Sequence, residues 1–273
     1  MVKIILMRHA ESVFNSRVEQ IQDKWFCKDH IPKSEYESLL KQAYTDTSPD
    51  LINTKLTEKG HTQSHSIAAT LQARYPALKA ALVSPMRRTM QTMEQSLKTH
   101  PRFSTLKIQF LENLREALMV NCDMGIWQPQ MKSDLEFVDK YDWSFFNKFQ
   151  NPNFWFIENC SADQRTELEA QLEGVQGLDQ QTQKIAHYLG KDLPGKKFEN
   201  HKGIYDRVQK CKEEIRGIVR GGGYGDGEVI VVSHSRTLKV WLCQEFREDW
   251  SPDPKNSVTL QNCEIVEYEL ECN

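Results

Sequence analysis

Apolar residues along this chain gather in short runs, and the stretches between the runs carry apolar residues at helical spacing. The runs are rich in valine, isoleucine, leucine and alanine, which is typical of buried strands. Four runs predict strands, and they span residues 3–7, 80–83, 106–110 and 228–232. Residues 258–270 alternate apolar and polar side chains, which predicts a final strand at the edge of a sheet.

The stretches between the runs predict helices. The segment that opens at Thr57 runs to about Arg74 and is stopped before Pro76, because proline cannot continue a helix. The predicted helices span residues 57–74, 88–98, 164–172, 180–189 and 203–219. Strands that alternate with helices predict a three-layer α/β/α sandwich, with a mostly parallel central sheet and an edge strand.

We expect one domain over residues 1–273, with two insertions. Residues from about 16 to 52 are polar with scattered aromatic side chains. Residues from about 120 to 160 are rich in tryptophan and phenylalanine, which predicts a folded excursion near the pocket mouth. We expect most of its aromatic rings to be local core and some to line the entrance. These rings belong to Trp127, Trp143, Phe145, Phe146 and Trp155.

Composition narrows the function classes. The net charge is -3, so the chain shows no general attraction to nucleic acid or acidic membranes. Its longest apolar stretches are too short to span a membrane. The first strand begins at residue 3, so we expect no signal or transit peptide and a cytoplasmic location. The seven cysteines lack metal-site spacing, and we expect them to be reduced thiols.

Charged and polar residues follow three of the predicted strands, where each strand ends. Arg8 and His9 follow the first, Arg87 and Arg88 come after the second, and His234 follows the fourth. The carboxyl ends of parallel strands meet at one edge of a sheet, so we expect these side chains to lie together. A helix start after His9 would add amide groups that favour an anion. Taken singly, each residue could instead be structural; together they predict a phosphate pocket.

Five segments carry this chemistry in chain order. They are LMRHAESVFN at 6–15, NTKLTEKG at 53–60, SPMRRTMQT at 84–92, ENLREALM at 112–119 and VVSHSRTLKVW at 231–241. Together they resemble the motifs of the histidine phosphatase superfamily, the phosphoglycerate-mutase-like proteins. Ala10 stands where that family usually has glycine. The resemblance spans nearly the whole chain and implies the family's α/β fold and phosphohistidine chemistry.

The resemblance also implies a role for each site residue. His9, neutral and held by a backbone carbonyl at one ring nitrogen, would attack phosphorus with the other. Arg8 and Arg88 would clamp the phosphate oxygens, and a protonated His234 would share their charge. Glu116 would protonate the leaving oxygen and then act as base on water. These cations would supply the charge that a metal supplies elsewhere, so we expect neither metal nor cofactor.

Several assignments keep an alternative. Asn15 would add a neutral donor to the pocket, or it caps a helix. Arg88 fits the family pattern better than Arg87, which would be a solvated neighbour or an auxiliary phosphate contact. Glu112 lies four residues before Glu116 and is the second candidate for the acid.

The segment after Glu116 bears on the reaction type. Cys122 and Asp123 stand there in place of the mutase pattern, and this pair resembles the plant and protist phosphoglycerate-mutase-like proteins. We therefore expect a phosphatase that acts on a small phosphorylated metabolite or a phosphoprotein. The alternatives are a phosphoglycerate mutase and a non-catalytic phosphate-binding scaffold of the same fold.

Overall fold

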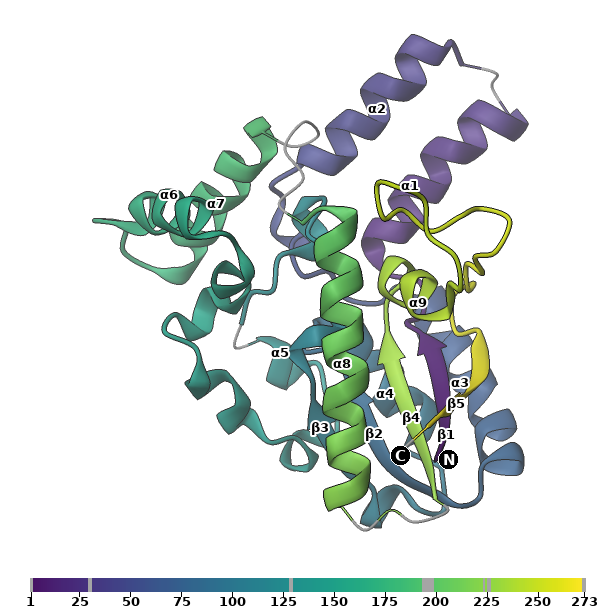
Figure 1. Ribbon diagram of the computed structural model, residues 1–273. Helices are drawn as coiled ribbons and strands as arrows, with labels where there is room; N and C mark the ends of the chain where they lie inside the picture. Colours follow the sequence, from purple (N-terminus) through teal and green to yellow (C-terminus); the bar gives the residue numbers. More distant parts are fainter. Residues whose placement is uncertain are drawn as a thin grey trace.

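A computed structural model describes residues 2–28, 31–127, 130–192, 199–222, 224 and 227–271. Within these residues one sheet has the strand order β3-β2-β4-β1-β5 (Figure 1). The strands are β1 (Val2–Arg8), β2 (Leu78–Val83), β3 (Lys107–Phe110), β4 (Glu228–Ser233) and β5 (Ile265–Leu270). All neighbours are parallel except β5, which runs antiparallel to β1. The expected mostly parallel sheet with an edge strand is confirmed.

The edge strand is shorter than its alternating pattern predicts. It begins at Ile265 instead of residue 258. Cys263 has a left-handed backbone with φ of 60°, which bends the chain just before the strand. The preceding residues lie over the end of β1, where the carbonyl of Leu260 accepts a hydrogen bond from Arg8. The residues before Ile265 therefore contact the end of β1 and do not pair with it along the sheet edge.

Helices account for most of the remaining regular structure. The α-helices are α1 (Val13–Asp23), α2 (Lys33–Thr45), α3 (Glu58–Arg74), α4 (Arg87–Leu97), α5 (Gln130–Ser133), α6 (Ala162–Leu172), α7 (Leu178–Asp192), α8 (His201–Gly221) and α9 (Ser235–Leu242). One π-helical turn spans Lys24–Lys28. Short 3-10 helices span Pro49–Leu51, Phe103–Thr105, Glu112–Leu114, Asn121–Asp123, Val138–Lys140, Trp143–Lys148 and Pro152–Asn159. The five predicted helices correspond to α3, α4, α6, α7 and α8.

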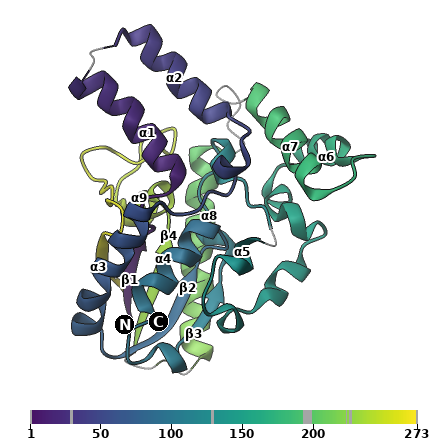
Figure 2. The same ribbon diagram turned by 180° about the vertical axis from the view of Figure 1, so that it is seen from behind.

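Both faces of the sheet are covered. Ile5 and Met7 point into the core layer that contains α3 and α4, whereas Ile4 and Leu6 point into the layer of α8 and α9. Figures 1 and 2 show these helix pairs on opposite faces of the sheet. This arrangement explains why the central strands read as continuous apolar runs. The predicted three-layer sandwich is confirmed.

The segment 16–52 forms a helical hairpin. Its first helix, α1, begins at Val13, just before the segment expected to be an insertion. Helices α1 and α2 lie side by side and project beyond the carboxyl ends of the strands (Figures 1 and 2). The ring of Trp25 stacks on that of Tyr36, with centroids 4.9 Å apart, where the two helices approach. The hairpin therefore stands beside the edge of the sheet where the predicted site lies.

The segment 120–160 packs as an aromatic cluster against the last residues of β3. The ring of Phe110 contacts those of Tyr141, Trp143, Phe145 and Phe146, with centroids 5.5 to 5.7 Å apart. Phe154 and Trp155 are fully buried in the same apolar cluster. Most of these side chains therefore extend the core, as expected.

Two further expectations concern cysteines and membranes. The cysteines at 122, 160, 211, 243 and 263 are free thiols, whereas the side chain of Cys27 and all of Cys272 lie outside the described residues. No helix in the described part of the chain is both long and apolar enough to cross a membrane.

Candidate active site

The two histidines meet because their strands are neighbours. Arg8 at the end of β1 is in register with Ser233 at the end of β4, so the next residue on each strand is a histidine. The backbone N–H of His9 donates to the carbonyl of Ser233 at 3.0 Å. The rings of His9 and His234 lie edge to face, with centroids 5.2 Å apart. The sheet register thus places both imidazoles at one edge of the sheet.

The ring of His9 is fixed at both nitrogens. Its Nδ1 lies 2.7 Å from the carbonyl oxygen of Ala10, which can only accept, so this nitrogen carries the proton. Its Nε2 then accepts a hydrogen bond from Nε of Arg88 at 3.3 Å. Burial, together with the charges of Arg88 and Arg8, holds the pKa of His9 well below its usual value of 6.5. The imidazole is therefore neutral, with a lone pair on the nitrogen that faces Arg88.

Helix α4 brings Arg88 into the site from its first turn. Arg88 is 2% exposed. Its Nη1 donates to the carbonyl of Cys122 at 2.8 Å, and its Nη2 pairs with Oδ1 of Asp123 at 3.2 Å. Arg87 instead forms an ion pair with Asp134, away from the pocket. Of the two arginines considered from sequence, Arg88 is the one that lines the pocket.

His234 lies behind His9 and is fully buried. Its Nε2 is 2.8 Å from the hydroxyl of Ser84, and its Nδ1 has no hydrogen-bond partner among the described residues. Burial and the charge of Arg88 hold the pKa of His234 well below 6.5. These surroundings favour a neutral ring, which is the opposite of the protonated form expected from the resemblance.

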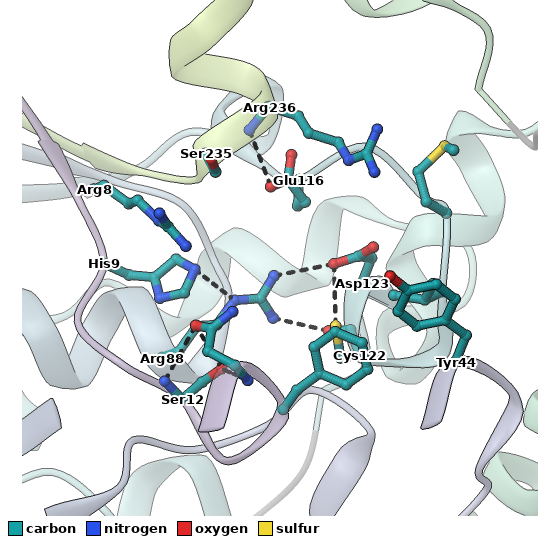
Figure 3. Close-up of a pocket in the computed structure, with 14 residues that line it drawn as sticks. Arg8, His9, Ser12, Tyr44, Arg88, Glu116, Cys122, Asp123, Ser235 and Arg236 are labelled. Atoms are coloured by element: carbon teal, nitrogen blue, oxygen red, sulfur yellow. Dashed lines mark hydrogen bonds and ion pairs between the residues drawn. The ribbon is translucent and has the colours of Figure 1, made fainter. Parts of the chain in front are cut away.

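Arg8 reaches the pocket from the end of β1. One of its terminal nitrogens, Nη1, donates to the carbonyl of Leu260 at 2.8 Å. Its Nε is buried and has no partner among the described residues. One edge of the guanidinium is thus anchored to the segment before β5, and this anchor directs the side chain into the pocket (Figure 3).

Glu116 faces the pocket at the start of α9 (Figure 3). Its Oε1 accepts from the backbone N–H of Ala117 at 2.9 Å, and its Oε2 accepts from that of Arg236 at 3.3 Å. Glu112 pairs with Lys148 at 3.2 Å and does not line the pocket. Position therefore favours Glu116 over Glu112 as the acid.

The backbone that carries Glu116 is held from behind by a buried ion-pair cluster. Glu199 pairs with Arg115 at 2.9 Å and with Arg207 at 2.8 Å. Arg207 also donates to the carbonyl of Arg115 at 2.8 Å. The two guanidinium groups lower the pKa of Glu199 to about 2, against the effect of its burial. The cluster fixes the chain just before the candidate acid.

Asn15 caps a helix and lies at the pocket wall, whereas its role as a donor to a bound phosphate stays a prediction. Its Oδ1 accepts from the backbone N–H and the hydroxyl of Ser12, at 3.2 and 3.0 Å, and this contact forms a capping box at the start of α1. The side chain also lines the pocket. The cap therefore fixes the position of the amide at the pocket wall.

The pocket itself has a volume of about 280 Å³. Sequence reasoning placed six residues in the pocket: Arg8, His9, Asn15, Arg88 and Glu116 line its wall, whereas His234 lies buried beside His9 and does not line it. Sequence reasoning assigned no role to the remaining lining residues, which are Ser12, Phe14, Tyr44, Met119, Val120, Cys122, Asp123, Ser235 and Arg236. The Cys122-Asp123 pair was noticed only as a departure from the mutase pattern, and Arg236 follows the second histidine motif by two residues.

The expectation that aromatic rings of 120–160 line the entrance is wrong. The rings at the pocket are those of Phe14 and Tyr44, which stack with centroids 6.0 Å apart. Both come from the helical hairpin α1–α2. The rings of 127–155 pack toward β3, because a sheet edge next to a large apolar cluster offers more buried contact than a polar pocket.

Asp123 is the second carboxylate of the pocket. Burial raises its pKa from an ordinary value of 3.8 to about 6; the charge of Glu116 acts in the same direction, and Arg88 opposes it. The thiol of Cys122 lies 3.4 Å from Oδ1 of Asp123. Within the described residues, no group of three or more histidine, cysteine, aspartate or glutamate side chains is placed to hold a metal ion. Toward an anion the pocket presents the guanidinium groups of Arg8, Arg88 and Arg236 and the neutral imidazole of His9.

A family model described as histidine phosphatase superfamily (branch 1) matches residues 49–164. The match supports this superfamily. The matched segment includes Arg88, Glu116 and Asp123, whereas His9 and His234 lie outside it. No curated protein matches the chain significantly.

Several solved structures resemble this chain. The ecdysone phosphate phosphatase of Bombix mori, in complex with tungstate, is 15% identical, with 98% of this chain and 88% of that chain covered, at a TM-score of 0.48. A mycobacterial glucosyl-3-phosphoglycerate phosphatase is 14% identical, with 97% and 91% covered, at a TM-score of 0.44. A phosphoserine phosphatase of Entamoeba histolytica, in complex with 3-phosphoglyceric acid, is 15% identical, with 98% and 90% covered, at a TM-score of 0.41.

A close backbone contact accounts for the glycine in the second of the superfamily-like segments. The hydroxyl of Thr57 accepts from the backbone N–H of Gly60 at 3.0 Å and so caps α3. A Cβ on Gly60 would lie 2.1 Å from the carbonyl oxygen of Glu11. That carbonyl accepts from the backbone N–H of Thr57 at 3.1 Å. The capped turn thereby packs against the loop that follows His9.

Proposed function

We propose that this protein is a phosphatase that hydrolyses phosphate monoesters through a phosphohistidine on His9. The observation that carries the proposal is the state of the His9 ring. Its Nδ1 proton is held by the carbonyl of Ala10, and its Nε2 lone pair points to the guanidinium of Arg88. A neutral nucleophile beside a fixed cation is what attack on an anionic phosphorus requires.

The first half-reaction transfers the phosphoryl group to His9. Arg8 and Arg88 bind the nonbridging oxygens of the ester, with Asn15 as a further donor. Nε2 of His9 forms a bond to phosphorus as the bond from phosphorus to the leaving oxygen breaks. Glu116, carrying a proton, gives it to that oxygen, and the alcohol leaves. Binding of the phosphate dianion draws a proton from solvent onto His234, whose positive charge then stabilises the phosphoryl oxygens; this proton returns to solvent when inorganic phosphate leaves.

The second half-reaction releases inorganic phosphate. Glu116, now a carboxylate, accepts a proton from a water molecule. The oxygen of that water bonds to phosphorus as the phosphorus–nitrogen bond breaks, and His9 returns to its neutral form. Glu116 is thus the acid of one step and the base of the other.

Substitution of the nucleophile tests the mechanism. His9→Ala removes the only imidazole placed on the pocket wall by the described residues, so turnover of an aryl phosphate falls to background. Rapid quench of the wild-type protein with a radiolabelled substrate traps acid-labile phosphate, and His9→Ala traps none. Near-normal turnover in a folded His9→Ala protein excludes the mechanism. A wild-type protein that binds phosphate but never turns over aryl phosphate is the non-catalytic scaffold instead.

We further propose that the phosphatase works without a metal ion. Arg8 and Arg88 supply the positive charge that a divalent ion supplies in other phosphatases. Activity therefore survives prolonged dialysis against a chelator. Loss of activity that one added metal restores would contradict the proposal.

A small phosphorylated molecule fits the pocket best. A volume of about 280 Å³ is at the low end for ligand sites and admits a phosphate with a short organic group. The Cys122-Asp123 pair, which stands in place of the mutase pattern, supports kinship with the plant and protist phosphoglycerate-mutase-like proteins. It also favours hydrolysis over phosphoglycerate mutation, a preference tested by looking for 2-phosphoglycerate formation from 3-phosphoglycerate.

A further inference from the structure

Arg236 is an exposed cation on the pocket wall that the proposed chemistry does not use. Its backbone N–H donates to Glu116, but its side chain extends past that carboxylate along the pocket (Figure 3). In Figure 3 the guanidinium lies on the side of the pocket away from Arg8 and His9. The side chain is therefore separate from the group of residues assigned to the phosphate.

Arg236 also differs from Arg8 and Arg88 in that its guanidinium has no partner among the described residues. Arg88 is paired with Asp123 at 3.2 Å, and Arg8 is anchored on the carbonyl of Leu260. Within the part of the chain that the structure describes, the guanidinium of Arg236 has neither an ion pair nor a hydrogen bond. The charge of Arg236 nevertheless acts on the pocket: burial raises the pKa of both Asp123 and Tyr44, and the positive charge of Arg236 partly opposes that rise.

The surroundings of this guanidinium suit a short organic group. Met119 and Val120, which lie between Glu116 and Asp123 in the chain, line the pocket, and Tyr44 lines it from the hairpin. An organic group attached to the phosphate would lie against these apolar surfaces. A second negative charge at its far end would reach the unpaired guanidinium, because an arginine fork favours planar carboxylates.

We propose that Arg236 is a specificity-determining residue that selects phosphate monoesters with a carboxylate at the far end of a short carbon chain. This inference rests on the proposed phosphatase function. It adds the chemical class of the substrate and the side chain that recognises it. Selection takes place at the pocket wall, through a contact that leaves the reacting phosphorus untouched.

Nonhydrolysable ligands test the recognition without the need for turnover. The probes are ω-carboxyalkyl phosphonates with two, three and four carbons, each matched to the alkyl phosphonate of the same length. Titration calorimetry gives the ratio of the two affinities for each length. At the best-fitting length the wild-type protein binds the carboxylated ligand about tenfold tighter, the size of one charge-assisted contact.

Variants show whether this preference belongs to Arg236. Arg236→Gln brings the ratio close to one, and Arg236→Lys keeps part of it because the positive charge remains. Lys239→Gln is the matched control: it removes one positive charge from the same helix, α9, at a residue that does not line the pocket. It leaves the ratio at the wild-type value.

Two outcomes overturn the inference. One is a wild-type protein that binds both members of each pair equally or prefers the alkyl phosphonate. The other is a preference that survives Arg236→Gln or disappears in Lys239→Gln. Turnover of the corresponding phosphate esters is measured separately. Absence of hydrolysis by the wild-type protein contradicts the proposed phosphatase function, whereas an affinity ratio insensitive to Arg236 contradicts only the assignment of substrate class.

Discussion

The guanidinium of Arg88 pairs with the carboxylate of Asp123, at 3.2 Å between Nη2 and Oδ1, while its Nε donates to the ring of His9. Both members of the ion pair are buried. Arg88 therefore already has an anionic partner when a phosphate enters. Any oxyanion that binds against His9 must share this arginine with Asp123.

The sharing predicts a pH effect on anion binding. Asp123 has a pKa of about 6, so it is charged above that pH and neutral below it. A charged Asp123 repels the anion and competes for Arg88; the affinity for sulfate, a dianion throughout, thus rises as the pH falls from 7.5 to 5. Asp123→Asn lacks the charge at every pH. We expect it to bind sulfate up to about tenfold tighter than wild type at pH 7.5.

The measurement is competitive inhibition of aryl phosphate turnover by sulfate at several pH values. Acidification changes the charge of other groups as well, so the informative quantity is the ratio of the inhibition constants of wild type and Asp123→Asn at each pH. This ratio approaches one at pH 5. A ratio that stays constant from pH 5 to 7.5 would show that Asp123 does not control access to Arg88.

Glu116→Gln tests the acid through the leaving group. An alkoxide needs a proton in the transition state, whereas nitrophenolate leaves without one. The substitution keeps the side-chain shape, so it slows phosphorylation by alkyl phosphates about 10²–10⁴-fold and by p-nitrophenyl phosphate much less. Single-turnover kinetics isolate this step from dephosphorylation. Glu112→Gln is the control and behaves as wild type; equal losses on both substrates in Glu116→Gln would exclude the assignment.

We expect substitutions in the core aromatic cluster to affect stability, and substitutions of the aromatic residues at the pocket to affect substrate preference. Trp155 is fully buried in the core, so Trp155→Ala lowers the free energy of unfolding by about 3–5 kcal/mol and leaves the ranking of substrates unchanged. Tyr44→Ala removes a ring from the pocket wall and weakens aryl relative to alkyl phosphates several-fold, since ring contacts contribute about 0.5–1.5 kcal/mol. Urea titrations and kcat/KM values on both substrates separate the cases. A changed ranking of substrates in Trp155→Ala would instead show that residues 120–160 determine substrate specificity.

The low pKa of Glu199 leads us to expect that the free energy of unfolding decreases in acid. Its folded pKa of about 2 lies below the ordinary 4.5, so its stabilisation is complete above pH 4.5 and is lost as the pH falls toward 2. The shift corresponds to about 3 kcal/mol of unfolding free energy, at about 1.4 kcal/mol per pKa unit. Glu199→Gln lowers stability at pH 7 by leaving Arg115 and Arg207 unpaired, and its stability depends less on acid pH. Thermal unfolding between pH 7 and 3 checks this, and parallel curves for the two proteins would contradict it.

Sequence patterns predicted the sheet better than the pocket wall. Buried strands such as β1 and β4 are recognisable in the sequence as apolar runs. Because these strands are parallel neighbours, the residues that follow them lie at the same edge of the sheet. The pairing of Arg88 with Asp123 joins residues 35 positions apart across a loop of 3-10 turns, and no local pattern encodes it. The same holds for Tyr44, which reaches the pocket only because α2 packs back along α1. These contacts depend on tertiary packing, which single-sequence patterns do not record.

The order of strands in the sheet also bears on how the protein is made. Strand β1 is the first element of the chain, yet its two neighbours are β4 and β5, which begin at Glu228 and Ile265. During synthesis, β1, which directly precedes His9, therefore lacks both of its pairing partners until Glu228–Ser233 has been made. Such distant pairing is slow and leaves an apolar segment open to chaperones. His9 and His234 can come together only after β4 has been synthesised, so nascent chains carry the nucleophile long before they can use it.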